Sequence, residues 1–217
     1  MSRARTRKMA DEALAAGTPT AWFERLYREA EGDVTRVPWA DLRPNQRLEQ
    51  WYTENQVQGE DRSACVVGAG LGDDAEALCG LGFRVTAFDL SETAIAWAKR
   101  RYPNTAVEYE VADLLEVESR YRKGFDLVFE AYTIQSMPLS LRVSALDAIA
   151  QLVAPKGELL VIARHRADGT IPDGPPWPLA EHELAPLDRV LQRLRFDLYA
   201  EAGDPATPRF LAAYRRS

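Results

Sequence analysis

The sequence predicts an α/β protein with a doubly wound, Rossmann-like sheet of seven strands, mostly parallel and closed by an antiparallel C-terminal hairpin. Three observations indicate this fold. Short apolar runs alternate with helical segments, a glycine-rich turn follows the first apolar run, and two β-rich segments end the chain with too few residues between them for a crossover helix. The 217 residues, 46% of them hydrophobic, suit a single domain over residues 1–217.

The N-terminal part precedes the alternating pattern. Residues 1–17 carry the basic run Arg3, Arg5, Arg7 and Lys8 and are expected to form a flexible, solvated tail or a short helix. Residues 18–60 are expected to hold two helices, one over 20–30 and one around Leu48 and Trp51.

The Rossmann-like core is expected over residues 61–217. Apolar runs that are typical of strands buried on both faces lie at 64–67, 84–88, 107–111, 126–131 and 159–162. Between them, helices are expected from Asp73 to about Gly82, after the N-cap Ser91, and along the stripe Val143, Leu146, Ile149 and Val153. Pro155-Lys156-Gly157 is expected to turn into the fifth strand.

The end of the chain departs from this alternation. A helix is expected over about 179–194, followed by strands near 195–200 and 208–214. The short loop between these strands can only join an antiparallel pair.

A candidate ligand site follows the first strand, in Gly68-Ala69-Gly70-Leu71-Gly72-Asp73-Asp74. Glycines permit a tight turn and a close approach of backbone to ligand, and the amides at the start of the next helix face that ligand. Asp89 lies 21 positions after Gly68, at the end of the next strand and before Leu90. An acid in that position can accept hydrogen bonds from both ribose hydroxyls of a nucleoside.

The charge of this turn favours S-adenosylmethionine over a dinucleotide. A dinucleotide site would have a third glycine at position 73, where this chain has Asp73 followed by Asp74. Two carboxylates would oppose a diphosphate but suit a ligand that carries a sulfonium and an ammonium group. We therefore expect S-adenosylmethionine as the cofactor and S-adenosylhomocysteine as its product.

Two further segments reach the carboxyl edge of the predicted sheet, where ligands bind in such folds. Asp113 follows the third strand, where it could accept from an adenine amino group or cap a helix, and Ala112 and Leu114 offer backbone and apolar contact. Glu130 and Tyr132 end the fourth strand, and Glu130 could instead bond structurally to backbone amides.

These segments resemble the thiopurine S-methyltransferase and halide/thiol methyltransferase group. The resemblance is carried by the glycine-rich turn with Asp74, by Phe88-Asp89-Leu90-Ser91-Glu92-Thr93-Ala94, by Val37-Pro38-Trp39 with Trp22 before it, and by Asp173-Gly174-Pro175-Pro176-Trp177. It implies that residues 18–60 close over the cofactor, with Trp22 and Trp39 lining the site and Trp177 on a substrate-side loop. The segment from Glu130 to Pro138 departs from the halide enzymes.

The expected reaction is direct displacement of the sulfonium methyl group by a small-molecule thiol or a similar soft nucleophile. A thiol needs little activation because a few per cent is already thiolate near neutral pH. A hydroxyl acceptor would need a general base, for which Glu130, Tyr132 and His165 are the candidates. The alternatives are an O- or N-methyltransferase of a small metabolite and a noncatalytic S-adenosylmethionine-binding protein.

Composition limits the other partners. The net charge of −6 gives nucleic-acid binding no electrostatic help, and no apolar run is long enough to span a bilayer. Two cysteines and two histidines, without zinc spacing, predict no metal and no disulfide framework. We expect a cytoplasmic monomer or homodimer.

Overall fold

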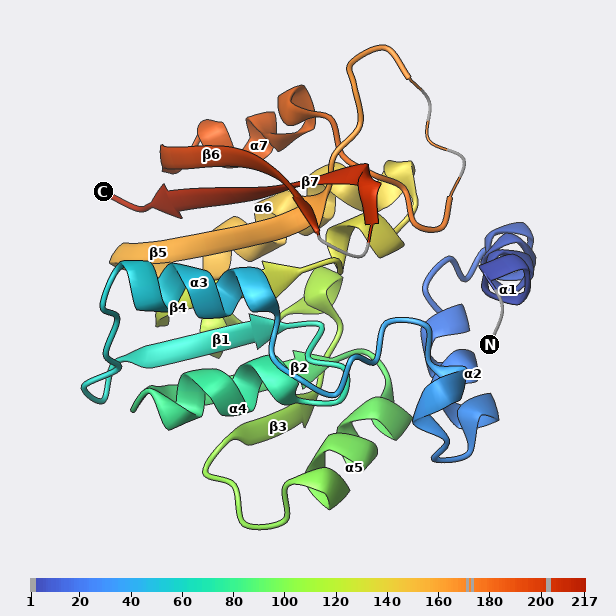
Figure 1. The fold of residues 1–217 in the computed structure, drawn as a ribbon, viewed down its shortest axis with the longest axis horizontal. Helices are drawn as coiled ribbons and strands as arrows, with labels where there is room; N and C mark the ends of the chain where they lie inside the picture. The colour runs from blue at the N-terminus through green and yellow to red at the C-terminus, as the bar shows by residue number, and fades with distance from the viewer. Residues whose placement is uncertain (1–2, 171, 173, 202–203) are drawn as a thin grey trace.

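A seven-stranded sheet in the order β3-β2-β1-β4-β5-β7-β6 forms the centre of the protein (Figure 1). The computed structural model describes residues 3–217 apart from 171, 173, 202 and 203. Strands β1 to β5 pair in parallel, and β7 runs antiparallel to both β5 and β6. The predicted fold is therefore confirmed. The strands are β1 (Ser63–Val67), β2 (Arg84–Asp89), β3 (Glu108–Val111), β4 (Phe125–Ala131), β5 (Val153–Arg164), β6 (Gln192–Glu201) and β7 (Asp204–Arg215).

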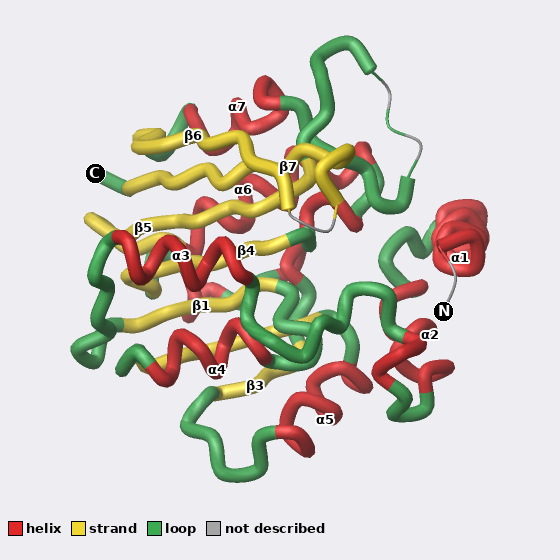
Figure 2. Tube along the Cα trace, viewed as in Figure 1, coloured by secondary structure: helices red, strands yellow, loops and turns green. Residues whose placement is uncertain are grey.

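Helices cover both faces of the sheet and one of its ends (Figure 2). One face carries α3 (Gln46–Glu54), α4 (Asp73–Gly80) and α5 (Glu92–Arg101), and the other carries α6 (Arg142–Leu152) and α7 (Ala185–Asp188). The helices α1 (Arg3–Ala15) and α2 (Trp22–Ala30) lie beyond the carboxyl ends of β1 and β2. Short 3₁₀ helices are η1 (Val34–Arg36), η2 (Leu114–Glu116), η3 (Ser119–Tyr121), η4 (Ile134–Ser136), η5 (Leu139–Leu141) and η6 (Glu181–Leu184).

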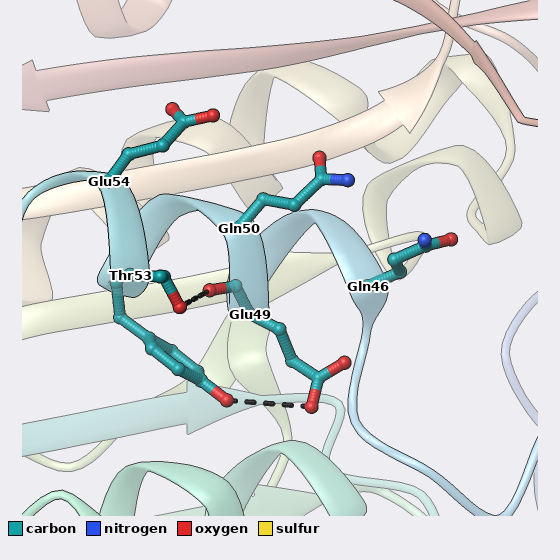
Figure 3. Close-up of a pocket in the computed structure, with 6 residues that line it drawn as sticks. Gln46, Glu49, Gln50, Thr53 and Glu54 are labelled. Carbon is teal, nitrogen blue, oxygen red and sulfur yellow. Dashed lines mark hydrogen bonds between the residues drawn. The ribbon is translucent and has the colours of Figure 1, made fainter.

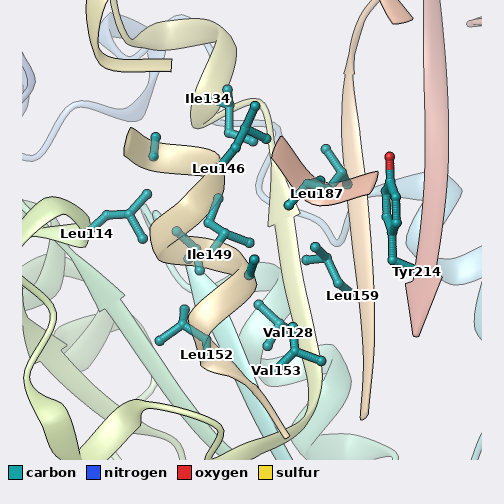
Figure 4. Close-up of a cluster of buried hydrophobic side chains, with 14 of the residues drawn as sticks. Leu114, Val128, Ile134, Leu146, Ile149, Leu152, Val153, Leu159, Leu187 and Tyr214 are labelled. Atoms are coloured by element: carbon teal, nitrogen blue, oxygen red, sulfur yellow. The ribbon is translucent and has the colours of Figure 1, made fainter. Parts of the chain in front are cut away.

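The two layers of helix bury separate apolar clusters. Figure 4 shows the cluster beneath α6, where Leu146, Ile149 and Leu152 pack on Val128 and Leu159 of the sheet. Alternate residues of the same strands enter the cluster beneath α3, α4 and α5, so that both faces of the central strands are buried. This double burial explains why those strands are continuous apolar runs in the sequence.

For residues 1–17 we expected a flexible tail or a short helix, and over residues 3–15 the structure shows the helix. Residues 3–15 form α1, whose Met9, Ala10 and Ala13 are buried in one cluster with Trp22 and Leu26 of α2. Ion pairs join the two helices, including Arg5 to Glu29 of α2 at 2.5 Å. The few apolar side chains that anchor α1 are interspersed with charged residues, so no apolar run in the sequence indicated a packed helix.

Three other boundaries differ from the predicted ones. Of the predicted stripe, Leu146 and Ile149 are buried in α6 as expected, whereas Val143 is 54% exposed and Val153 begins β5. Ala145 and Leu152 complete the buried face of α6. Pro155-Lys156-Gly157 lies inside β5, where the register shifts opposite β4. Where a helix was predicted over 179–194, η6 and α7 end by Asp188, because β6 already pairs with β7 from Gln192 onward.

No helix in the described part of the chain is both long and apolar enough to cross a membrane.

Candidate cofactor site

The glycine-rich turn between β1 and α4 is shaped by three left-handed glycines. Gly68, Gly70 and Gly72 have φ values of 66°, 53° and 93°, a region that side chains rarely adopt. A Cβ on Gly68 would lie 2.1 Å from the Thr133 hydroxyl oxygen, and one on Gly70 would lie 3.1 Å from that of Tyr27. The Ala69 amide donates to the Phe88 carbonyl at 2.9 Å, so the turn is tied to the end of β2.

Asp89 is the buried acid of this site. One carboxylate oxygen accepts from the Gly70 amide and the other from the Ser91 amide, both at 2.9 Å. Burial raises its pKa, although these amide hydrogen bonds oppose the rise. A carboxylate offers about four acceptor positions, so these two amides leave capacity for the hydroxyl groups of a ligand.

Helix α2 is fixed to the same place by Glu24, a residue that sequence reasoning missed. Its two carboxylate oxygens accept from the Ser91 hydroxyl at 2.7 Å, from the Thr93 hydroxyl at 2.6 Å and from the Thr93 amide at 3.1 Å. Ser91 also caps α5 as predicted, accepting from the Ala94 amide at 3.0 Å. The N-terminal helices are therefore anchored next to Asp89.

Aromatic side chains of the N-terminal part cover the glycine-rich turn. The Trp39 indole donates to the Tyr27 hydroxyl at 2.8 Å, and that hydroxyl faces Gly70. Burial, with the nearby charge of Asp89, raises the pKa of Tyr27. Trp22 is 2% exposed and meets the 38% exposed Trp39 edge to face, with ring centroids 5.9 Å apart. Tyr27 lies in the helix expected over residues 20–30, and its contact with Gly70 had no sequence signal.

The loop that carries Trp177 reaches the same N-terminal helices. Trp177 is 8% exposed and belongs to the buried cluster formed by α1 and α2. Its amide donates to the Gln135 carbonyl, and its own carbonyl accepts from Arg142 at 2.7 Å. Asp173, the first residue of the Gly-Pro-Pro-aromatic segment, lies outside the described residues.

The remaining acids of the predicted cofactor set hold local structure. Asp113 caps η2 by accepting from the Leu115 amide at 2.8 Å, and the adjacent Ala112 amide bonds to the Asp89 carbonyl at 3.0 Å. Asp74 accepts from the Asn45 amide at 2.6 Å at the start of α3. Burial, assisted by the charges of Asp73 and neighbouring acids, raises the pKa of Asp74 to about 7.

Glu130 is a buried acid at the end of β4. Its Oε1 accepts from the amides of Thr133 and Ile134 at 2.6 and 3.0 Å, whereas the buried Oε2 has no hydrogen-bond partner among the described residues. Burial raises its pKa to about 7. Glu130 therefore fixes the turn that places Thr133 over Gly68.

Tyr132 and His165 point to different parts of the protein. Tyr132 has a φ of 64°, which is uncommon for a residue with a side chain, and it packs with the cluster under α3 to α5. His165 instead meets Phe196 edge-on, with ring centroids 6.4 Å apart, and Phe196 packs on the cluster under α6 and α7. The three catalytic candidates are thus not brought together.

A family model matches the part of the chain that carries this arrangement. Residues 65–157, which contain the glycine-rich turn, Asp89, Asp113 and Glu130, match the family model described as a methyltransferase domain. The central part of the chain is therefore similar to methyltransferase domains.

Solved structures share the fold of this protein at low sequence identity. The N-methyltransferase NodS from Bradyrhizobium japonicum WM9, in complex with S-adenosylhomocysteine, is 20% identical, with a TM-score of 0.66 over 88% of this chain and 98% of that one. Magnesium protoporphyrin IX methyltransferase from Synechocystis PCC 6803 is 15% identical, with a TM-score of 0.70 over 90% and 98%. A structure reported for the conversion of a disulfide bond into a thioacetal group during echinomycin biosynthesis is 20% identical, with a TM-score of 0.73 over 91% and 93%.

A separate groove lies along helix α3 (Figure 3). It contains none of the predicted site residues, and the side chains in it are Gln46, Glu49, Gln50, Tyr52, Thr53 and Glu54. The Tyr52 hydroxyl bonds to Glu49 within it at 3.5 Å. We assign no part of the cofactor site to this groove.

Proposed function

We propose that this protein is an S-adenosylmethionine-dependent methyltransferase, which transfers a methyl group to a small-molecule thiol or a similar soft nucleophile by direct displacement. The observation that carries the proposal is the position of Asp89. Its buried carboxylate ends β2, bonds to the tip of the glycine-rich turn and keeps acceptor capacity for two ribose hydroxyls.

The residues present fit S-adenosylmethionine. Left-handed Gly68 and Gly70 leave out the Cβ atoms that would block the turn, and the Asp73 carboxylate is neutralised by Arg101 at 2.7 Å. We assign the ribose to Asp89 and Leu90. The adenine would lie along Ala112, Asp113 and Leu114. Gly68, Ala69 and Gly70 would supply the backbone cradle.

The N-terminal helices supply the cover in this proposal. Trp39 and Tyr27 would shield the cofactor from the side of Gly70, and the buried Trp22 would hold Trp39 through their edge-to-face contact. Asp74 and Glu130 would contribute negative charge near the sulfonium and ammonium groups. The bound cofactor supplies an activated methyl group, so the chain's main task is alignment, which can contribute roughly 7–11 kcal/mol.

The arrangement of the candidate bases favours a soft nucleophile. Glu130 caps a turn, His165 faces Phe196, and burial raises the pKa of the Tyr132 phenol, which weakens it as a base at neutral pH. None of these three described residues therefore offers an available basic atom that could take the proton of a hydroxyl acceptor. A thiol acceptor can react without one.

O- or N-methyl transfer is the second candidate function. The unpartnered Oε2 of Glu130, on a carboxyl group whose pKa is about 7, has the acidity that suits a general base if the turn at Thr133 opens. The fold likeness to an N-methyltransferase is compatible with this alternative. A noncatalytic role in binding S-adenosylmethionine would be the conclusion if binding occurred without turnover.

The decisive experiment is turnover of methyl-labelled S-adenosylmethionine against a panel of thiols, halides, phenols and amines. We expect label in the thiols, and modest rate losses when Glu130, Tyr132 and His165 are each replaced by alanine. Label confined to phenols or amines, with a large loss in one of these variants at unchanged cofactor affinity, would favour the base-dependent alternative.

A further inference from the structure

A polar cluster lies outside the cofactor site, at the edge of the sheet where β4 and β6 end and β7 begins. The Glu201 carboxylate is held between two donors: the Tyr132 hydroxyl donates to one oxygen at 3.0 Å, and an Arg209 guanidinium nitrogen lies 2.9 Å from the other. Glu201 is the last residue of β6, and its side chain is 39% exposed, whereas that of Arg209 is only 6% exposed. The buried guanidinium of Arg209 and the Tyr132 phenol therefore bind the partly exposed Glu201 carboxylate at the end of β6.

The cluster also has donors to spare. The buried Tyr199 hydroxyl and the buried Nε of Arg209 donate to no acceptor among the described residues, although the Tyr199 oxygen lies within hydrogen-bond reach of the Tyr132 hydroxyl. Buried donors are seldom left unsatisfied, because each costs the free energy of its lost hydration. A polar ligand that accepts hydrogen bonds would satisfy both donors.

The charges around the cluster balance in pairs. Asp204 lies 3.4 Å from Arg209, and a hydrogen bond from Thr207, with the charges of Arg209 and Arg164, holds the pKa of Asp204 below its ordinary value. Arg164 is the register partner of Arg209 across β5 and β7. Two arginines thus face two carboxylates, Asp204 and Glu201. The carboxylate of a bound ligand could take the place of the Glu201 carboxylate without changing the net charge within the cluster.

We propose that the methyl acceptor carries a carboxylate, which displaces Glu201 from Tyr132 and Arg209 and takes an additional hydrogen bond from Tyr199. This inference rests on the proposed function and specifies its substrate class. Tyr132 follows β4 and directly precedes Thr133, whose side chain meets Gly68, so the main chain that carries the Tyr132 phenol borders the cofactor site. When no acceptor is bound, the Glu201 carboxylate occupies the acceptor's position and pairs with Tyr132 and Arg209.

The test compares 4-mercaptobenzoate with 4-mercaptobenzamide, which differ only in the charge of the group offered to the cluster. We expect kcat/KM to favour the benzoate by about tenfold or more, mainly through KM, because charge-assisted hydrogen bonds are lost with the amide. Tyr132→Phe and Arg209→Lys should each reduce this preference, and Glu201→Gln should lower KM for the benzoate alone. Glu158→Gln is the matched control, since Glu158 pairs with Arg215 at the opposite edge of the same strands.

Equal kcat/KM for the two thiols would overturn the proposal, and so would a preference that survives both Tyr132→Phe and Arg209→Lys. If neither thiol is methylated, the proposed thiol activity fails separately. The inference is then tested by calorimetry of benzoate and benzamide binding to the S-adenosylhomocysteine complex. Tighter binding of benzoate that requires Tyr132 supports the inference, and its absence in both the unmodified protein and Glu201→Gln contradicts it.

Discussion

The carboxylate of Asp89 accepts a hydrogen bond from the Gly70 amide at 2.9 Å, which joins the end of β2 to the tip of the glycine-rich turn. If this acid also binds the ribose, Asp89→Ala should weaken S-adenosylhomocysteine binding by about 2 kcal/mol, as charge-assisted hydrogen bonds are lost. Calorimetry measures the affinity. Asp126→Ala is the control, because Asp126 likewise accepts an amide hydrogen bond, from Ser63, but at the amino edge of β4. Unchanged affinity in Asp89→Ala would contradict the ribose assignment.

The anchoring of α2 by Glu24 predicts a stability difference between two glutamates of one helix. Glu24→Ala should lower the free energy of unfolding by about 1–3 kcal/mol, because three donors on Ser91 and Thr93 lose their acceptor. Glu29→Ala should cost less than Glu24→Ala, since Glu29 is held by surface ion pairs with Arg5 and Arg25. Urea unfolding of both variants measures the two free energies. Equal losses in unfolding free energy would contradict the anchoring role of Glu24.

The effect of Glu24 should also depend on pH. Burial opposes its ionisation, but hydrogen bonds from Thr93 and Ser91 outweigh it and hold the pKa below the ordinary 4.5. A lowered folded pKa stabilises the protein above the unfolded pKa, and that contribution disappears as pH falls through the folded value. The stability gap between the unmodified protein and Glu24→Ala should therefore be constant near neutral pH and shrink below about pH 4.5.

The glycine-rich turn should not tolerate a side chain at Gly68. Gly68→Ala would combine a φ of 66° with a Cβ only 2.1 Å from the Thr133 hydroxyl oxygen. We expect a loss of about 3 kcal/mol in unfolding free energy, against about 1 kcal/mol for Gly169→Ala, which has a φ of 78° but no heavy atom within 4 Å of its added Cβ. Adding Thr133→Ala to Gly68→Ala should recover part of the difference, and no recovery would show that the clash is not the cause.

Glu130 predicts a second pH dependence, of opposite sign. Burial raises its folded pKa to about 7, so its ionisation is harder in the folded state. The folded protein should lose stability, relative to a Glu130→Gln variant, as pH rises from about 4 to 7, by up to on the order of 3 kcal/mol. The side-chain amide of that variant would keep an oxygen for the backbone amides of Thr133 and Ile134. Unfolding curves at pH 5 and pH 8 measure this change, and parallel behaviour of the two proteins would contradict it.

Local sequence signals predicted the part of the fold that positions the cofactor. Apolar runs identified the parallel strands, and the small residue before a helix identified Ser91 as an N-cap. Asp89 was placed at the end of β2 by the same run. Each of these features depends on a few neighbouring residues, which is why a single sequence reveals it.

Features that depend on distant partners were missed. Pro155-Lys156-Gly157 looks like a turn, but Lys156 and Gly157 form backbone hydrogen bonds with Arg216 at the far end of the chain. Leu184, Leu187 and Leu191 have helical spacing, yet pairing with β7 ends the helix early. The contacts of Glu24 with Thr93, and of Tyr132 with Glu201, span 69 residues each and leave no local pattern.

The most direct test of the account is a crystal structure of the protein grown with S-adenosylhomocysteine. The account predicts the ribose hydroxyls within hydrogen-bond distance of the Asp89 carboxylate, with the adenosyl group between the glycine-rich turn and Trp39. An adenosyl group bound elsewhere, with Asp89 still bonded only to the amides of Gly70 and Ser91, would contradict it.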